Sequence, residues 1–217
     1  MKNFQVEMKL KKQKKKLKIF KQKKIREECG VFGIHDFNDA STITALGLHA
    51  LQHRGQEGCG IVSFDGKNFH SEKRHGLVGD NFTNNEILKK LPGKSAIGHN
   101  RYSTTGETSL RNIQPFFADI FGGGISVAHN GNFTNALKLR NKLVRDGAIF
   151  RTTSDTETVV QLIAKSKRPK MIDKIIDTLF QVQGGYALVM MSNKKLIGAR
   201  DPLGIRPLVL GLSLIHI

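Results

Sequence analysis

Short apolar runs, each bounded by Gly, Asn, Asp or Pro, follow one another along the chain from residue 28 onward. Turn-forming residues at both ends of a short apolar run are typical of β-strands. Several runs are apolar at consecutive positions, which indicates strands in sheets that are covered on both faces. The pattern predicts seven strands, over residues 30–34, 60–64, 95–99, 124–128, 186–191, 195–200 and 206–211.

Apolar residues spaced three and four positions apart predict four helices. Ser154 and Glu157 fit a capping box, with the Ser as N-cap and the Glu at N3, and Gly147 fits the C′ position after another helix. Strands and helices each come in runs and do not alternate strictly, so a layered α+β fold in the order helix, sheet, sheet, helix is favoured. The helices are predicted over residues 39–52, 135–146, 154–166 and 172–183.

The composition is that of a globular chain with one sizeable core, because 39% of the 217 residues are hydrophobic and 24% are charged. The net charge is +17, and residues 1–28 contribute +9 of it, with twelve Lys and Arg against three Glu. Such a lysine block is typical of a solvated tail, and binding to nucleic acid or to an anionic membrane is the alternative. Lysines interrupt its apolar residues, so it lacks the apolar core of a secretory signal.

No P-loop, dinucleotide-binding glycine pattern or metalloprotease motif is present, and the eight His show no metal-ligand spacing. Gly122-Gly123-Gly124 is interpreted as a hairpin turn, and Cys59 as a small buried residue. Two cysteines without extracellular context favour a reducing cytoplasm. The remaining candidates for chemistry are Cys29 and three polar clusters, His53-Arg54-Gly55-Gln56, Asn100-Arg101-Tyr102-Ser103-Thr104 and His129-Asn130-Gly131-Asn132.

Six motifs stand in a fixed order between residues 27 and 211. They are Glu-Glu-Cys-Gly-Val-Phe-Gly-Ile (27–34), Leu-Gln-His-Arg-Gly-Gln-Glu-Gly (51–58), Gly-His-Asn-Arg-Tyr-Ser-Thr (98–104), Ala-His-Asn-Gly-Asn (128–132), Thr-Ser-Asp-Thr-Glu (153–157) and Arg-Asp-Pro-Leu-Gly-Ile-Arg-Pro-Leu (200–208). In this order the chain resembles the class II glutamine amidotransferases, and the second motif resembles their purine-biosynthetic branch. The resemblance implies an N-terminal-nucleophile hydrolase fold, a four-layer αββα sandwich of two mainly antiparallel sheets.

The resemblance implies that Cys29 is the nucleophile and that its own α-amino group is the base. An amino group with a pKa of about 7.7–8.0 is partly neutral near pH 7 to 8 and lies within reach of the thiol. Because that group exists only at a chain start, residues 1–28 are expected to be a leader that is removed before Cys29. The Asn130 side chain and the Gly131 N–H are expected to bind the oxyanion; an Asn-Gly turn is the structural alternative.

Glutamine recognition is expected to use opposite charges at the two ends of its zwitterion. Arg101 would bind the α-carboxylate and Asp155 the α-ammonium, with a surface cation and a first-turn helix acid as the structural alternatives. Residues 101–112, with Gly106 as a hinge, match the family's glutamine loop. Thr104, Arg54 and Gly55 are expected to line the same pocket.

The function that the resemblance implies is hydrolysis of glutamine to glutamate and ammonia through a Cys29 thioester. In full-length relatives, a second domain uses the ammonia to convert phosphoribosyl pyrophosphate into 5-phosphoribosylamine, the first step of purine biosynthesis. We find no motif of that domain, so residues 29–211 are expected to be an amidotransferase domain, incomplete at its C-terminus, with 212–217 unassigned. Other class II members, of the aminosugar or glutamate synthase type, and an inactive fragment with the same fold are the alternatives.

Cofactors and partners follow from the same resemblance. No metal site is expected in this chain, and the ligands of the Mg²⁺ ion, and of the 4Fe–4S cluster that the family allows, are expected outside it. L-glutamine is the expected partner, together with homo-oligomerisation of the full-length protein, and neither nucleic acid nor membrane is expected to bind. The expected location is the cytoplasm.

Overall fold

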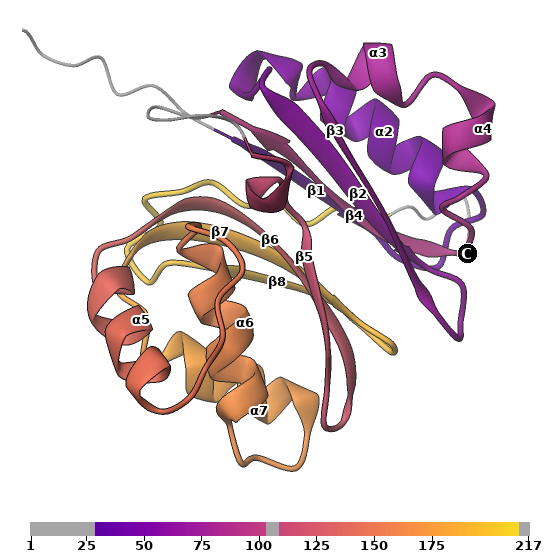
Figure 1. The fold of residues 1–217 in the computed structure, drawn as a ribbon. Coiled ribbons are helices and arrows are strands. Elements are labelled where there is room, and N and C mark those ends of the chain that lie inside the picture. The colour runs from indigo at the N-terminus through magenta and orange to yellow at the C-terminus, as the bar shows by residue number, and fades with distance from the viewer. Residues whose placement is uncertain (1–28, 103–108, 213–217) are drawn as a thin grey trace, which may run out of the picture.

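Two four-stranded antiparallel sheets form the centre of the protein in the computed structural model, which describes residues 29–102 and 109–212 (Figure 1). The strand order is β1-β4-β2-β3 in the first sheet and β5-β6-β7-β8 in the second. The first sheet consists of β1 (Gly30–Ile34), β4 (Ser95–Arg101), β2 (Gly58–Phe64) and β3 (Phe69–His75). The second consists of β5 (Phe116–Ile120), β6 (Gly123–Phe133), β7 (Gly184–Ser192) and β8 (Leu196–Arg200).

Helices cover the outer face of each sheet, which confirms the predicted αββα layering (Figure 1). The first sheet carries α2 (Ala40–Ala50), α3 (Val78–Asn81) and α4 (Asn85–Leu88). The second sheet carries α5 (Ala136–Arg145), α6 (Thr156–Lys165) and α7 (Met171–Leu179). Two short 3₁₀ helices, η2 (Gln52–Arg54) and η3 (Leu110–Asn112), lie in the connections.

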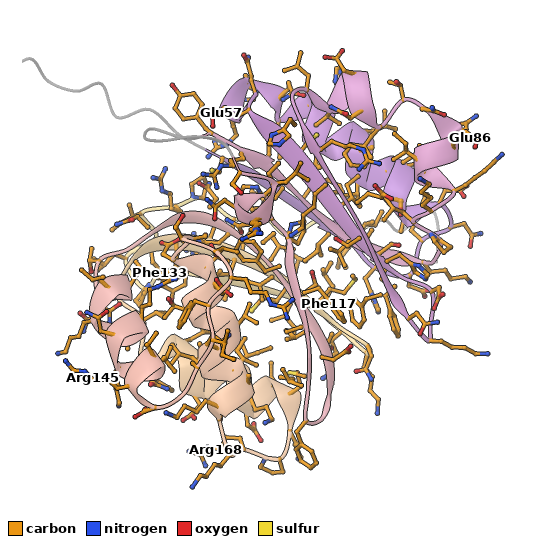
Figure 2. All side chains as sticks on the ribbon, viewed as in Figure 1. Glu57, Glu86, Phe117, Phe133, Arg145 and Arg168 are labelled. Carbon is orange, nitrogen blue, oxygen red and sulfur yellow. The ribbon has the colours of Figure 1, made fainter. Side chains whose placement is uncertain are left out.

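The apolar core has three layers, because neighbouring residues of a strand point to opposite faces. Ile61 of β2 packs with Leu48 of α2, whereas the next residue, Val62, packs with Val189 of β7 between the two sheets. A third cluster fills the space between the second sheet and its helices. Figure 2 shows side chains occupying the spaces between all four layers. The continuous apolar runs in the sequence therefore correspond to strands buried on both faces.

The predicted strand over residues 206–211 is wrong, since this segment makes no strand in the structure. The buried carboxylate of Asp201 accepts hydrogen bonds from the backbone N–H groups of Ile205 and Arg206, at 2.9 and 3.0 Å. These bonds turn the chain away from the edge of β8, and the Pro207 nitrogen has no hydrogen to donate to a ladder. The segment instead packs Leu208 against the core between the sheets.

The capping box predicted at α6 is wrong, because the N-cap residue is Asp155 and not Ser154. The Ser154 hydroxyl still accepts from Thr156 N at 3.3 Å, which satisfies one N–H group of the first turn. The Glu157 carboxylate does not return to Ser154 but reaches further back, accepting from Arg151 N at 2.8 Å and Thr152 N at 2.7 Å. Glu157 therefore fixes the loop before the helix. The predicted C′ glycine of α5 is confirmed, with Gly147 directly after the C-cap and at φ 88°.

Candidate active site

Three candidate residues lie at one end of the sandwich formed by the two sheets. The cluster between the sheets contains one residue from each of β1, β4 and β6, namely Val31, Ile97 and Ala128. Because side chains alternate along a strand, Arg101 and Asn130 belong to the same faces as Ile97 and Ala128. The ladder between β1 and β4 ends at the pair Gly30 and Asn100, so Cys29 and Arg101 are the next residues on the two chains at that end. On the facing sheet, the carbonyl oxygen of His129, next to Asn130, lies 3.2 Å from His99 Nε2 of β4. The strands therefore bring a thiol, a guanidinium and an amide to one end of the sandwich.

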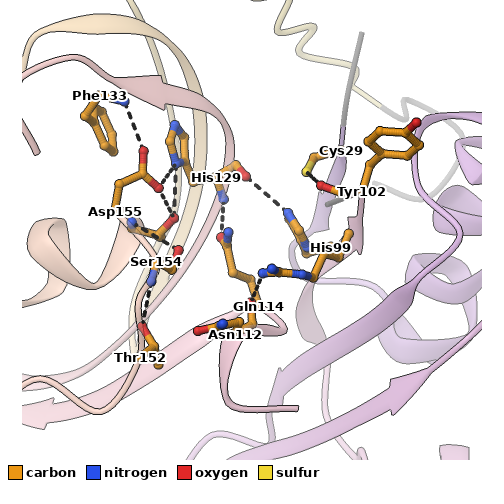
Figure 3. Close-up of polar contacts among 12 residues, drawn as sticks. Cys29, His99, Tyr102, Asn112, Gln114, His129, Phe133, Thr152, Ser154 and Asp155 are labelled. Carbon is orange, nitrogen blue, oxygen red and sulfur yellow. Dashed lines mark hydrogen bonds and ion pairs between the residues drawn. The ribbon is translucent and has the colours of Figure 1, made fainter. Parts of the chain in front are cut away.

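Cys29 is held on both sides of its backbone by Arg54. Its backbone nitrogen donates to the Arg54 carbonyl at 2.8 Å, and Arg54 Nε donates to the Cys29 carbonyl at 2.8 Å. The half-buried thiol lies 3.7 Å from the Tyr102 carbonyl oxygen (Figure 3). Cys29 has φ 65°, in the left-handed region that residues other than glycine seldom adopt. The Arg54 contacts thus fix an uncommon backbone conformation at the candidate nucleophile.

Arg101 and Gly55 lie in direct contact. A Cβ atom at Gly55 would stand 2.7 Å from the Arg101 carbonyl carbon, so only glycine allows this close approach. Arg101 Nη1 donates to the Asn112 carbonyl at 2.8 Å, while its buried Nε has no hydrogen-bond partner among the residues described. The Asn112 side chain in turn pairs with Thr153 through two hydrogen bonds of 3.0 and 3.1 Å. Arg101 is therefore tied to the loop that precedes Asp155.

Asn130 and Gly131 occupy a constrained part of β6. Asn130 is 3% exposed, and its Oδ1 has no hydrogen-bond partner within the part of the chain that the structure describes. Gly131 has φ 144°, and a Cβ there would lie 2.2 Å from the Gly185 carbonyl oxygen on β7. The Asn130 side chain thus has unused hydrogen-bonding capacity, and the residue that follows it must be glycine.

Asp155 is held by groups from β6 and α6 (Figure 3). Its Oδ2 accepts from Phe133 N at 3.0 Å, and its Oδ1 accepts from the Thr156 hydroxyl at 3.4 Å and lies 3.6 Å from His129 Nδ1. Burial raises the pKa of this carboxyl, but the hydrogen bonds from His129, Phe133 and Thr156 outweigh burial, so its pKa is lowered. The side chain remains 23% exposed, so part of an ionised carboxylate can still reach a ligand.

A buried polar column joins the two sheets next to these groups. His129 N donates to Gln114 Oε1 at 2.8 Å, and His99 Nε2 contacts the His129 carbonyl oxygen at 3.2 Å. Burial lowers the pKa of His99 to about 3, so its ring is neutral at physiological pH. No site role was predicted for His99, Gln114 or Thr153, and Asn112 was predicted only as the last residue of the 101–112 loop. No short motif marks Asn112 or Gln114, whereas His99 stands inside a motif already noted.

The two cysteines differ in environment. Cys59 is fully buried, as predicted, and burial raises the pKa of its thiol to about 12, so it stays protonated.

Thr104 and Gly106 lie outside the described residues, so the structure does not place them or the centre of the 101–112 loop. Within residues 29–102 and 109–212, no group of three or more His, Cys, Asp or Glu side chains is arranged to hold a metal ion.

The fold and the site together define a glutamine amidotransferase domain, and residues 99–214 match the family of that description. The chain is 59% identical over 187 residues to the amidophosphoribosyltransferase of Rhizobium etli, covering 86% of this chain and 38% of the relative. It is 45% identical over 189 residues to the amidophosphoribosyltransferase of Lacticaseibacillus casei, covering 87% of this chain and 97% of the relative. This chain therefore belongs to the amidophosphoribosyltransferase family.

A solved structure supports the same assignment. The glutamine phosphoribosylpyrophosphate amidotransferase of B. subtilis, solved as a complex with ADP and GMP, superposes with a TM-score of 0.79 at 43% sequence identity. The match covers 85% of this chain and 40% of that one. The chain thus spans about two fifths of the length of that relative. Among the residues described, no helix has the length and apolarity needed to cross a bilayer.

Proposed function

We propose that this chain hydrolyses the side-chain amide of L-glutamine to glutamate and ammonia, with Cys29 as the nucleophile. The observation that carries the proposal is that Cys29, Arg101 and Asn130 lie at the same end of the sandwich. The Cys29 thiol is 3.7 Å from the carbonyl oxygen of Tyr102, the residue after Arg101, and the carbonyl oxygen of His129, the residue before Asn130, is 3.2 Å from His99. Asn112 further connects Arg101 to Thr153, which stands two residues before Asp155. The relatives reported above are amidophosphoribosyltransferases, which favours this family over the aminosugar and glutamate synthase types.

Activation of the thiol requires removal of residues 1–28, so that Cys29 becomes the first residue. Its nitrogen already donates to the Arg54 carbonyl at 2.8 Å, a contact that an α-amino group can keep through one of its hydrogens. The lone pair of the neutral amine then takes the thiol proton, since its pKa of about 7.7–8.0 is close to physiological pH. Both groups are attached to the Cα atom of Cys29, so rotation of its side chain about the Cα–Cβ bond brings the thiol within reach of the nitrogen.

The thiolate attacks the amide carbon of glutamine, and the carbonyl oxygen becomes an oxyanion. The Asn130 side-chain amide and the Gly131 N–H donate to that oxygen, a contribution of about 2.7–4 kcal/mol per donor. The amine returns its proton to the leaving nitrogen, and ammonia departs as the γ-glutamyl thioester forms. Water then attacks the thioester, the sulfur leaves, and glutamate is released with the thiol restored.

Glutamine is selected by its two charged ends. The Arg101 guanidinium pairs with the α-carboxylate through its planar fork. Its buried Nε has no hydrogen-bond partner among the described residues and is therefore available to donate to that carboxylate. The Asp155 carboxylate pairs with the α-ammonium, and its lowered pKa keeps it ionised over the physiological range. Arg54 and Gly55 form the wall against Cys29 and Arg101, and Thr104 is assigned to the same pocket from the motif alone.

The wider role is amidophosphoribosyl transfer in purine biosynthesis, in which ammonia reacts with phosphoribosyl pyrophosphate to give 5-phosphoribosylamine. The names of the relatives support this role, and the acceptor chemistry would lie in sequence that this chain does not include. Mg²⁺ and any 4Fe–4S cluster would be held there as well. We assign the protein to the cytoplasm, because its two cysteines provide no disulfide framework. We expect homo-oligomers at full length, with no nucleic-acid partner.

The test is ammonia release from glutamine compared with glutaramate, which has the same amide but lacks the α-ammonium. We expect turnover of glutamine by the wild type and strong rejection of glutaramate. Cys29→Ser should greatly slow turnover, and Asp155→Asn should raise KM for glutamine while narrowing the preference over glutaramate. Asp146→Asn is a matched control, because Asp146 is an exposed partner of Lys165 on the surface. Equal use of both amides by the wild type would overturn the assignment of Asp155.

A further inference from the structure

His129 lies between the candidate recognition carboxylate and the core. Its side chain is 1% exposed and its ring stacks on Phe133, with ring centroids 4.3 Å apart. His129 Nδ1 lies 3.1 Å from the Thr156 hydroxyl oxygen and 3.6 Å from Asp155 Oδ1 (Figure 3). One ring nitrogen therefore faces two oxygens, one of which belongs to the group assigned to the α-ammonium.

The hydrogen bonds determine where the His129 hydrogen resides. The Thr156 hydroxyl donates its single hydrogen to Asp155 Oδ1 at 3.4 Å, so it accepts from His129 Nδ1. An ionised carboxylate can only accept, so both oxygens near Nδ1 require a hydrogen on that nitrogen. His129 Nε2 is buried without a partner among the described residues, so a hydrogen there would have no acceptor. The arrangement selects the Nδ1–H tautomer.

The His129 backbone is also fixed from both sides. Its N–H donates to the buried side chain of Gln114 at 2.8 Å, and its carbonyl oxygen contacts His99 Nε2 at 3.2 Å. The next residue along β6 is Asn130. The position of the His129 ring relative to Asp155 is therefore set by the same strand that carries the oxyanion donors.

We propose that His129 is a positioning residue, whose Nδ1–H orients the Asp155 carboxylate for the α-ammonium of glutamine through the Thr156 hydroxyl. The proposal rests on the proposed function, because it assigns His129 to the recognition of the same substrate. Its consequence is selective: losing this relay weakens binding of an amino-acid substrate and leaves the thiol chemistry intact. His129 itself does not touch the reacting atoms.

Two reagents separate recognition from thiol reactivity. A glutamine-analogue electrophile with a free α-ammonium must be recognised before it reacts with Cys29, and its labelling rate yields KI and the maximal rate. Iodoacetamide has no α-ammonium and reports the Cys29 thiol alone. Thr156→Val removes the hydroxyl at nearly constant volume and should raise KI about tenfold, the scale of a lost hydrogen bond to a charged group. The iodoacetamide rate at Cys29 should not change.

Matched variants distinguish the relay from general packing. Thr156→Ser keeps a hydroxyl and should raise KI less than Thr156→Val. Thr158→Val removes a buried hydroxyl from the same helix that has no partner among the described residues, so it should leave KI unchanged. His129→Asn, which keeps a donor near the position of Nδ1, should bind the analogue more tightly than His129→Leu.

Long-range ¹H–¹⁵N NMR of the wild-type ring provides a readout that does not depend on activity. It should show a protonated Nδ1 and a bare Nε2 at His129. The opposite tautomer, or an equal loss of analogue and iodoacetamide labelling in Thr156→Val, would overturn the proposal. Failure of the wild type to be labelled saturably by the analogue would instead contradict the proposed function, and the NMR result would still decide the tautomer.

Discussion

Gly131→Ala tests the constraint on β6 where the oxyanion donors are expected. Gly131 has φ 144°, a backbone conformation that costs about 1–3 kcal/mol for a residue with a side chain. The new Cβ would also lie 2.2 Å from the Gly185 carbonyl oxygen and 2.8 Å from the Tyr186 Cα. Both atoms belong to the backbone of β7, which cannot rotate away as a side chain can. Overpacking of this kind costs a further 1–3 kcal/mol, roughly.

The expected loss of unfolding free energy is about 4 kcal/mol, the middle of the combined range. With a urea m-value of about 2 kcal/mol per molar, the unfolding midpoint should fall by about 2 M. Displacement of the Gly131 N–H should also slow glutamine turnover by about 10²–10³-fold in folded protein, as loss of an oxyanion donor does.

Gly122→Ala is the matched control for urea unfolding followed by circular dichroism. Gly122 also has a positive φ of 103°, but a Cβ there would meet nothing within 4 Å. It should therefore show the backbone cost of about 1–3 kcal/mol without the clash. If the Gly131→Ala variant is no less stable than the Gly122→Ala variant, the predicted clash between β6 and β7 at residue 131 is refuted.

Three further predictions concern buried ionisable groups. Because burial raises the pKa of the Cys59 thiol to about 12, iodoacetamide at pH 8 should modify Cys29 in the folded protein and spare Cys59; peptide mapping that found equal labelling would contradict this. Burial lowers the pKa of Lys73 to about 8, so between pH 8 and about 10.5 the unfolded chain binds a proton that the folded chain lacks. Burial of Lys73 should therefore destabilise the fold fully below pH 8, and the unfolding free energy should rise as the pH increases across that window. Lys73→Met should abolish this rise in the urea midpoint. Equal pH dependence of the urea midpoint in both proteins would disprove the lowered pKa of Lys73. Glu157→Gln replaces a carboxylate that accepts from two backbone amides and the Thr152 hydroxyl, so thermal unfolding should show a loss of about 1–3 kcal/mol, whereas an unchanged melting temperature would contradict the role of these bonds.

The fold was predictable from the sequence where strands are buried on both faces. The apolar runs at β2, β4, β6 and β7 correspond to fully buried residues in the structure, so hydrophobicity alone marks them. The edge strand β3 (Phe69–His75) was missed because it is half-exposed and contains several charged residues. It is a strand because its backbone pairs with β2 along its whole length. The false strand at 206–211 shows the converse, in which one carboxylate, Asp201, outweighs local apolar character.

The candidate site was predictable only in part for a related reason. Short motifs identify Cys29, Arg101 and Asn130, whose chemistry is visible at single positions. The supporting contacts of Asn112 and Gln114 join residues far apart in sequence, such as Asn112 and Thr153, which are 41 positions apart. Neither hydrophobic periodicity nor a local motif encodes such a contact. They become visible only when the sheets are assembled.

The most direct test of the whole account is the intact mass of the purified protein before and after reaction with a glutamine-analogue electrophile. The proposed mechanism requires Cys29 to act as the first residue of the active chain. It therefore predicts a mass that lacks residues 1–28 and gains one label, which peptide mapping places on Cys29 and which Cys29→Ser abolishes. Saturable labelling of a chain that still carries residues 1–28, or no labelling of a chain that begins at Cys29, would contradict it.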